Sequence, residues 1–168
     1  MLKYQVCISA VCLGMLYTQA VAQQPSPPVS VITEQGAKQA FVGVEVNGFG
    51  LKTLHTLDVE GTHTSLATIQ RNKSETSGLS HDHVTEIYKI LDGEATLITG
   101  GAIPHGKAIF PAADPAVGPS HQGVIEGGRP EHVKAGDIVV IAPNTPHEFV
   151  QIDDHITYLA IRVSKDKY

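Results

Sequence analysis

Short β-prone runs separated by turn residues make up much of the sequence from residue 62 onward, and this alternation most constrains the fold. Beyond the first 22 residues, no long window has the apolar spacing of an amphipathic helix. Many short strands at this spacing are typical of an all-β sandwich or barrel. The predicted strands are 62–71, 87–91, 95–99, 137–142, 148–152 and 156–163.

Turn signals divide these runs. Asp92-Gly93 lies between the runs 87–91 and 95–99 and predicts a β-hairpin. The sequence Pro-Asn-Thr-Pro at 143–146 and the pair Asp153-Asp154 predict further breaks between strands.

The connection 100–135 is much longer than the usual loop of about 4–6 residues. It contains five prolines, and we therefore predict that it forms no single regular element. Loops of this length often act as lids over functional sites, so this segment is a candidate lid.

The first 22 residues have the layout of a secretory signal peptide. A single basic residue, Lys3, precedes an apolar stretch over 6–17, and Ala20-Val21-Ala22 forms an A-x-A cleavage site. The apolar stretch is shorter than the roughly 20 residues that span a bilayer, which argues against an uncleaved anchor. We therefore predict cleavage after Ala22 and a periplasmic or secreted protein that has no membrane attachment after cleavage.

The chain that remains after cleavage is expected to be one domain. Both cysteines, Cys7 and Cys12, leave with the signal peptide, so the remaining chain can form no disulfide. Residues 23–35 begin with a proline-rich, polar stretch and predict a flexible leader. Residues 36–168 have the length of a single domain.

Charge and composition narrow the expected partners. The formal net charge is −5 and becomes −6 after cleavage, because Lys3 is the only charged residue among the first 22. The remaining Lys and Arg are scattered, whereas binding to nucleic acid needs a basic face. No Trp is present to stack on sugar rings, which argues against a protein that binds carbohydrate polymers. The partner that we expect is a small-molecule ligand. Edge strands of a small barrel can pair between subunits, and a homodimer is one assembly we consider.

The stretch His-Asp-His-Val-Thr-Glu at 81–86 concentrates potential metal ligands. Residues two apart in a strand point to the same face, so His81 and His83 are expected to project together. Glu86 joins them only if the chain bends at Val84 and Thr85. Without partners from elsewhere in the chain, a polar surface turn explains the same residues better.

A second element strengthens the case for a metal site. In the stretch 135–150, a Gly-Asp turn precedes an apolar strand, a proline-rich turn and then His147 at the start of another strand. Taken alone, His147 is better explained as a half-buried core histidine. Because His147 occurs in the same chain as the stretch 81–86, the two elements together favour a metal site.

Together the two elements resemble the two motifs of the cupin superfamily, G(x)5HxH(x)3-4E(x)6G and G(x)5PxG(x)2H(x)3N. His81-Asp82-His83, Glu86 and Gly93 fit the first motif, and Gly136 and His147 follow the frame of the second. The resemblance implies a double-stranded β-helix, or jelly-roll barrel, with a metal inside it. The ligands that it implies are His81, His83, Glu86 and His147.

The sequence departs from the family pattern at several positions. Only Val84 and Thr85 separate His83 from Glu86, where the family more often has three or four residues, so the link is tighter. Asn144 stands where the second motif has glycine. Asn is the non-glycine residue that best tolerates left-handed backbone angles, so we expect the turn before His147 to be retained.

Other residues are candidates for a substrate pocket. Tyr88 shares the inward face expected for Glu86, and two residues of the strand 148–152 share the face of His147. If Arg71, at the end of the strand 62–71, points inward, it can bind a carboxylate bidentately. The pocket candidates are Tyr88, Arg71, Phe149 and Gln151. Arg162, within the run 156–163, is interpreted as a strand-edge charge.

The resemblance also implies a divalent transition metal. Three imidazoles and a carboxylate suit Fe, Mn, Zn, Ni or Cu, and they leave positions open for substrate or dioxygen. We expect a small metalloenzyme that acts on an oxygenated small molecule, of dioxygenase, decarboxylase, lyase or isomerase type. Two alternatives stay open, because fold alone does not fix function. They are a non-enzymatic module that binds a metal or small ligand, and a structural cupin without metal.

Overall fold

The computed structural model describes residues 29–40, 48–111 and 114–168. The chain divides after Val31, and the second unit, Ile32–Tyr168, carries the fold. The predicted signal peptide and residues 23–28 of the predicted leader lie outside the described residues. In the part of the chain that is described, no helix has the length and apolar character needed to cross a membrane.

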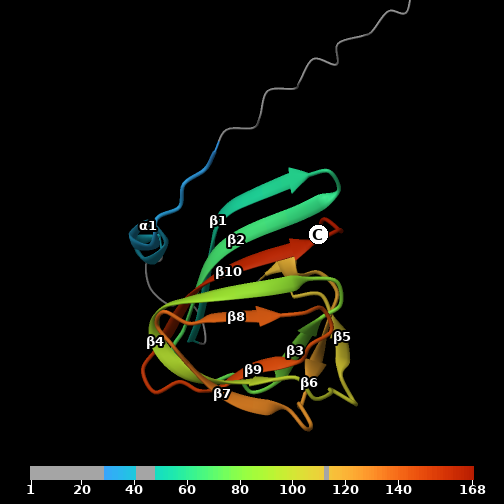
Figure 1. Cartoon of the computed structure of the whole chain (residues 1–168). Coiled ribbons are helices and arrows are strands. Elements are labelled where there is room, and N and C mark those ends of the chain that lie inside the picture. Colours follow the sequence, from blue (N-terminus) through green and yellow to red (C-terminus); the bar gives the residue numbers. More distant parts are fainter. Residues whose placement is uncertain (1–28, 41–47, 112–113) are drawn as a thin grey trace, which may run out of the picture. The chain divides into compact units, whose positions relative to one another are not determined.

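Antiparallel strands form two sheets that share one long strand, β4 (Figure 1). The strands are β1 (Phe49–Val59), β2 (Thr62–Arg71), β3 (Gly78–His81), β4 (Thr85–Thr99), β5 (Lys107–Ile109), β6 (Ser120–Gly123), β7 (Arg129–Lys134), β8 (Ile138–Ile141), β9 (His147–Gln151) and β10 (Ile156–Ser164). The first sheet has the order β1-β2-β10-β4-β8. The second has the order β7-β4-β9-β3-β6-β5. The predicted all-β, double-sheet architecture is confirmed.

The hydrophobic core combines side chains from both sheets. At its centre, the ring centroid of Tyr158 in β10 lies 4.7 Å from that of Tyr88 in β4 and 5.4 Å from that of Phe149 in β9. Aromatic pairs at these distances add to the stability gained by burying their area. The other core residues are Ile69, Ile90, Ala95, Leu97, Val133, Ile141, Ile156 and Ala160.

The hairpin predicted at Asp92-Gly93 is wrong, because β4 runs through this pair without turning back. Gly93 has a φ of 73°, and just before it the β10–β4 register shifts between Thr157 and Tyr158, so that Leu91 is the extra residue of β4. This β-bulge moves the buried face of β4 from even-numbered to odd-numbered residues, since one extra residue reverses the alternation. The two halves of β4 therefore pair with strands of different sheets and not with each other (Figure 1).

The segment 100–135 forms no single regular element, as predicted, but it contains short strands that the sequence did not indicate. Its described residues include β5, β6, β7 and the 3-10 turn η2 (Pro115–Val117). Pro130 lies within β7, which pairs with β4 alone among the described strands. Proline is tolerated on such an edge strand because its missing N–H faces away from the ladder. Strands of three to six residues are also too short to show a clear alternation in the sequence.

Two elements at the start of the folded unit were not predicted individually. The edge strand β1 is mostly exposed or half-buried, so its sequence lacks a clear apolar face. The helix α1 (Glu34–Gln39) begins within the predicted leader, where Thr33 caps it by accepting a hydrogen bond from Gly36 N–H. Its buried Ala37 accepts a hydrogen bond at its carbonyl from Thr68 of β2, at 3.0 Å.

Candidate metal centre

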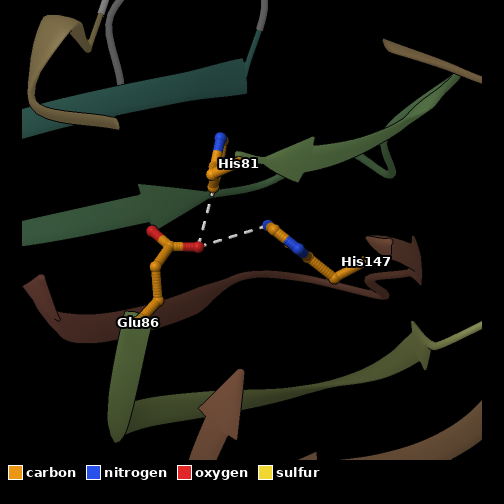
Figure 2. Close-up of side chains that lie close together, drawn as sticks. All are labelled: His81, Glu86 and His147. Carbon is orange, nitrogen blue, oxygen red and sulfur yellow. Dashed lines mark ion pairs between the residues drawn. The ribbon is translucent and has the colours of Figure 1, made fainter. Parts of the chain in front are cut away.

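Three buried side chains converge from three strands (Figure 2). His81 ends β3, Glu86 is the second residue of β4, and His147 begins β9. Glu86 Oε2 lies 3.5 Å from His81 Nε2 and 3.3 Å from His147 Nε2. One potential ligand atom from each residue lies within 4.8 Å of the other two. Such a group could hold one metal ion.

The two histidines are brought together by the pairing of β3 with β9 and by the turn before β9. In the ladder, Leu79 is the partner of His147. Asn144 has a φ of 59°, which confirms the left-handed turn expected from the sequence. Its backbone N–H donates to the carbonyl of His81 at 2.8 Å, and its side-chain amide donates to the carbonyl of Asp82 at 3.1 Å. These bonds fix the turn against the end of β3.

His83 does not join the group, so the expectation that His81 and His83 share one face is wrong. β3 ends at His81, and the chain bends at Asp82 and His83 before β4 begins at Thr85. The alternation of faces holds only within a strand. His83 is exposed and lines a separate surface depression, whereas Glu86 faces inward and is 1% exposed.

Hydrogen bonds on the far side of each ring determine which imidazole nitrogen carries the proton. Ser120 Oγ lies 2.8 Å from His81 Nδ1 and donates its own hydrogen to the carbonyl of Gly118, so it accepts from Nδ1–H. His147 Nδ1 lies 3.0 Å from the carbonyl oxygen of Thr145, which can only accept. In the neutral form of each ring the proton is therefore on Nδ1, and the Nε2 lone pair faces the shared carboxylate.

Glu86 is held in place by two donors. Arg162, its partner across the β10–β4 ladder, donates Nε–H to Oε1 at 2.9 Å, and Tyr88 donates its hydroxyl to Oε2 at 2.7 Å. Burial on its own raises the pKa of Glu86, but the opposing contributions, led by the charge of Arg162, lower this pKa to about 2. Glu86 is therefore ionised at neutral pH, and its Oε2 retains a lone pair for a cation.

Burial also determines the protonation of the neighbouring groups. It lowers the pKa of His81 to about 4, although Glu86 acts in the opposite direction. It raises the pKa of Tyr88 well above the usual value, and the adjacent carboxylate raises it further. At neutral pH the site thus combines a neutral imidazole at His81, a neutral phenol and a carboxylate.

The three residues line a cavity of about 200 Å³. One part of the wall is apolar and is formed by residues that include Phe49, Ile69 and Leu79. The other part carries Arg71, Glu75, Asp114 and Arg162. Pro111 and Asp114 come from the segment 100–135, so part of this predicted lid does border the site.

Arg71 lines this cavity, and it is already paired with protein groups. Its NH1 lies 3.0 Å from Glu75 Oε1, and its Nε donates to the hydroxyl of Tyr158 at 3.1 Å. The guanidinium carbon lies 4.8 Å from the ring centroid of Phe49, which is within the range of a cation–π contact.

Comparison with solved structures relates this arrangement to a known fold. A conserved protein with a double-stranded β-helix domain from Klebsiella pneumoniae subsp. pneumoniae aligns with a TM-score of 0.51 and 10% identity. The alignment covers 83% of this chain and 93% of that one. The chain has the double-stranded β-helix fold of the cupins.

Two other solved structures match at lower TM-scores. A cupin-2 domain from Rhodospirillum rubrum aligns with a TM-score of 0.46 and 14% identity, over 72% of this chain and 62% of that one. The DMSP lyase DddQ from Ruegeria pomeroyi aligns with a TM-score of 0.44 and 19% identity, over 79% of this chain and 54% of that one. The sequence matches no family model and no curated protein.

Several residues of this cavity were missed from the sequence. Arg162 was interpreted as a strand-edge charge, but it is 4% exposed and bonded to Glu86 and Asp114. Strand alternation could have identified it, since it shares the face of Tyr158 and Ala160 in β10. Asp114 lies in the segment between β5 and β6, and nothing in the local sequence indicated that it would reach the cavity.

Of the predicted pocket residues, two line the cavity and two do not. Tyr88 and Arg71 are part of its wall. Phe149 is 1% exposed and belongs to the hydrophobic core behind the wall. Gln151 is exposed and accepts a hydrogen bond from Thr96 on the surface. The inward face of β9 is therefore used for packing beyond His147.

Proposed function

We propose that this cupin binds one divalent transition metal through His81, Glu86 and His147. The observation that carries the proposal is the convergence of three electron-pair donors on one point. Both Nε2 lone pairs and Glu86 Oε2 face one another within 4.8 Å, and both ring protons are used elsewhere. Such a set of acceptors is stabilised by a cation between them.

The donor types favour a transition metal over Mg²⁺ or Ca²⁺, which prefer oxygen ligands. Two imidazole nitrogens and one carboxylate oxygen occur both in catalytic zinc sites and in non-haem iron sites with open positions. Mn, Ni and Cu also accept such a set. Glu86 would bind through Oε2 alone, because its Oε1 accepts the hydrogen bond from Arg162.

We further propose that the site acts on a small oxygenated molecule, in a dioxygenase, decarboxylase, lyase or isomerase type of reaction. A divalent ion supplies Lewis-acid chemistry or activates a bound oxygen ligand. The residues of the chain orient the ligands and limit access: Ser120 and Thr145 fix the imidazoles, and Arg162 fixes the carboxylate. The cavity of about 200 Å³ suits only a small substrate. A periplasmic or secreted location follows from the N-terminal sequence and belongs to the same proposal.

One contact favours the alternative of a binding or structural cupin. The Tyr88 hydroxyl lies 2.7 Å from Glu86 Oε2 and 3.5 Å from His147 Nε2. This hydroxyl satisfies part of the acceptor cluster without an ion. In that alternative the same residues hold the fold together or bind a ligand without turnover.

Metal analysis of the purified protein tests the proposal. After reconstitution under anaerobic conditions with each candidate ion, the wild-type protein is expected to retain stoichiometric metal through gel filtration. His147→Ala removes a ligand and is expected to lose it, whereas His83→Ala serves as the matched control because His83 is exposed. Absence of bound metal in the wild-type protein contradicts the proposal. Turnover of oxygenated substrates, assayed with and without air, then separates an enzyme from a binding module.

A further inference from the structure

The charged groups around the cavity do not balance once a metal ion is bound. The lining carries two arginines, Arg71 and Arg162, and three carboxylates, Glu75, Glu86 and Asp114. With a divalent ion, four positive charges face three negative ones, and one positive charge remains. An unbalanced charge in a poorly hydrated cavity is costly, so the metal-loaded site favours a ligand with a single negative charge.

Two hydrogen-bond donors in the cavity wall have no acceptor among the described residues. Arg71 uses Nε and NH1 in its contacts with Tyr158 and Glu75, and its NH2 donates to no described residue. The Tyr158 hydroxyl accepts from Arg71, and its own hydrogen has no acceptor in the described part of the chain. Both side chains line the cavity, so a ligand inside it can supply the acceptor that these donors lack.

These donors are rigid and lie next to each other. Phe49 stacks below the guanidinium at 4.8 Å, and Glu75 is itself fixed because its Oε2 accepts the backbone N–H of Phe149 at 2.9 Å. Burial raises the pKa of Tyr158 to about 12, even though Arg71 opposes this, so the hydroxyl keeps its proton at neutral pH. A guanidinium N–H beside a phenol O–H is suited to the two oxygens of a carboxylate.

We propose that the cavity binds a small organic monocarboxylate, held by Arg71 NH2 and the Tyr158 hydroxyl. The apolar part of the wall, which includes Ile69, Leu79 and Val117, receives the body of the ligand. A cavity of about 200 Å³ is smaller than the roughly 300–1,000 Å³ of pockets for drug-sized ligands, so this body is short. The proposal rests on the metal site above, because the ion supplies the charge that the carboxylate neutralises.

Calorimetric titration of the zinc-loaded protein with propionate and butyrate tests this proposal, with propionamide and butyramide as uncharged controls. Zinc is chosen because it does not change oxidation state. The acids are expected to bind and the amides to bind at least tenfold more weakly, about the value of one charged hydrogen bond. Arg71→Gln is expected to weaken acid binding by about tenfold to a hundredfold, and Tyr158→Phe by about threefold to tenfold. Arg129→Gln is the matched control, because that arginine is on the surface with its side chain 84% exposed.

The outcomes separate this proposal from the metal site itself. If the wild-type protein binds zinc but neither acid, or binds acids and amides equally, the monocarboxylate proposal is wrong while the metal site stands. Unchanged acid binding in both Arg71→Gln and Tyr158→Phe, at wild-type zinc content, also overturns it. If Arg71→Gln does not fold, Tyr158→Phe and the comparison of acid with amide decide. Failure of the wild-type protein to bind zinc contradicts the metal proposal instead.

Discussion

Glu86 and Arg162 form a buried ion pair at the centre of the site, and each depends on the other. They face each other across the β10–β4 ladder, and their side chains are 1% and 4% exposed. Pairs of this kind add little net stability, but removing one partner leaves an uncompensated buried charge. The carboxylate that we propose as a metal ligand is thus also a structural element.

The first residue-scale prediction concerns this pair. Arg162→Met is expected to lower the free energy of unfolding by about 3–5 kcal/mol, because Glu86 loses its counter-charge in the interior. The double variant Glu86→Gln/Arg162→Met removes both charges and is expected to recover part of that loss. Urea unfolding of the metal-free protein measures both values. If the double variant is no more stable than Arg162→Met, the loss does not arise from the unpaired charge of Glu86, since Asp114 also loses Arg162 in both variants.

The second residue-scale prediction concerns acid stability of the metal-free protein. The pKa of His81 falls from the ordinary 6.5 to about 4 in the folded state, chiefly through burial. Between these pH values the unfolded chain binds the proton more readily, so acidification favours unfolding. The contribution is roughly 3 kcal/mol, fully present above pH 6.5 and lost by about pH 4.

Urea unfolding at a series of pH values, in the presence of a chelator, measures the slope of the unfolding free energy against pH between about pH 4 and 6.5. His81→Asn is expected to flatten it across the window, whereas His83→Asn, at an exposed position, retains it. An equal slope in wild-type and His81→Asn proteins would show that His81 is not buried in its neutral form.

At the scale of elements, the site depends on the turn before β9 and on the link between β3 and β4. Only the first of these two connections has a recognisable signal in the sequence. The turn before β9 was predicted from Asn144, because a left-handed residue has a recognisable side-chain preference. The link between β3 and β4 was not predicted correctly. Strand alternation places His81 and His83 on one face, but it gives no warning that the strand ends at His81. The sequence correctly predicted that Glu86 and His147 lie in the site. It also wrongly included His83 among the ligands.

The bulge in β4 gives the element-scale prediction. A Cβ at Gly93 would lie 2.0 Å from the carbonyl oxygen of His155, in addition to the strain of a φ of 73°. Gly61 has a φ of 75° but no atom within 4 Å of such a Cβ. Gly61→Ala is therefore expected to cost about 1–2 kcal/mol of unfolding free energy through backbone strain alone. Gly93→Ala is expected to cost clearly more or to prevent folding. Equal losses, measured by urea unfolding, would contradict the close packing of β4 against the end of β10.

At the scale of the whole molecule, the sequence predicts the fold better than it predicts the cavity. Long strands such as β2 and β10 were predicted from their runs of β-prone residues. The two motifs indicated which strands carry the potential metal ligands. The wall of the cavity also needs Arg162 and Asp114, which are brought together from distant segments by strand pairing and by a loop. Such long-range contacts leave no local pattern. The predicted secretion, homodimer and small-molecule partner remain predictions.

The whole-molecule prediction concerns stabilisation by the metal. An ion that binds only the folded chain raises its stability by about 4 kcal/mol at a free concentration a thousandfold above Kd. Removing the ion with a chelator should therefore lower Tm, and adding it back should restore Tm. His147→Ala is expected to show no metal-dependent shift, whereas His83→Ala shows the full shift. A similar shift in His147→Ala would place the ion at another site.

The location of the ion can be measured directly by anomalous X-ray scattering from crystals of the metal-loaded protein. The arrangement of His81, Glu86 and His147 predicts one strong peak within bonding distance of both Nε2 atoms and Glu86 Oε2, with His83 still at the surface. A peak bonded to His83, or full metal content in solution with no peak between these three residues, would contradict this assignment of the metal centre.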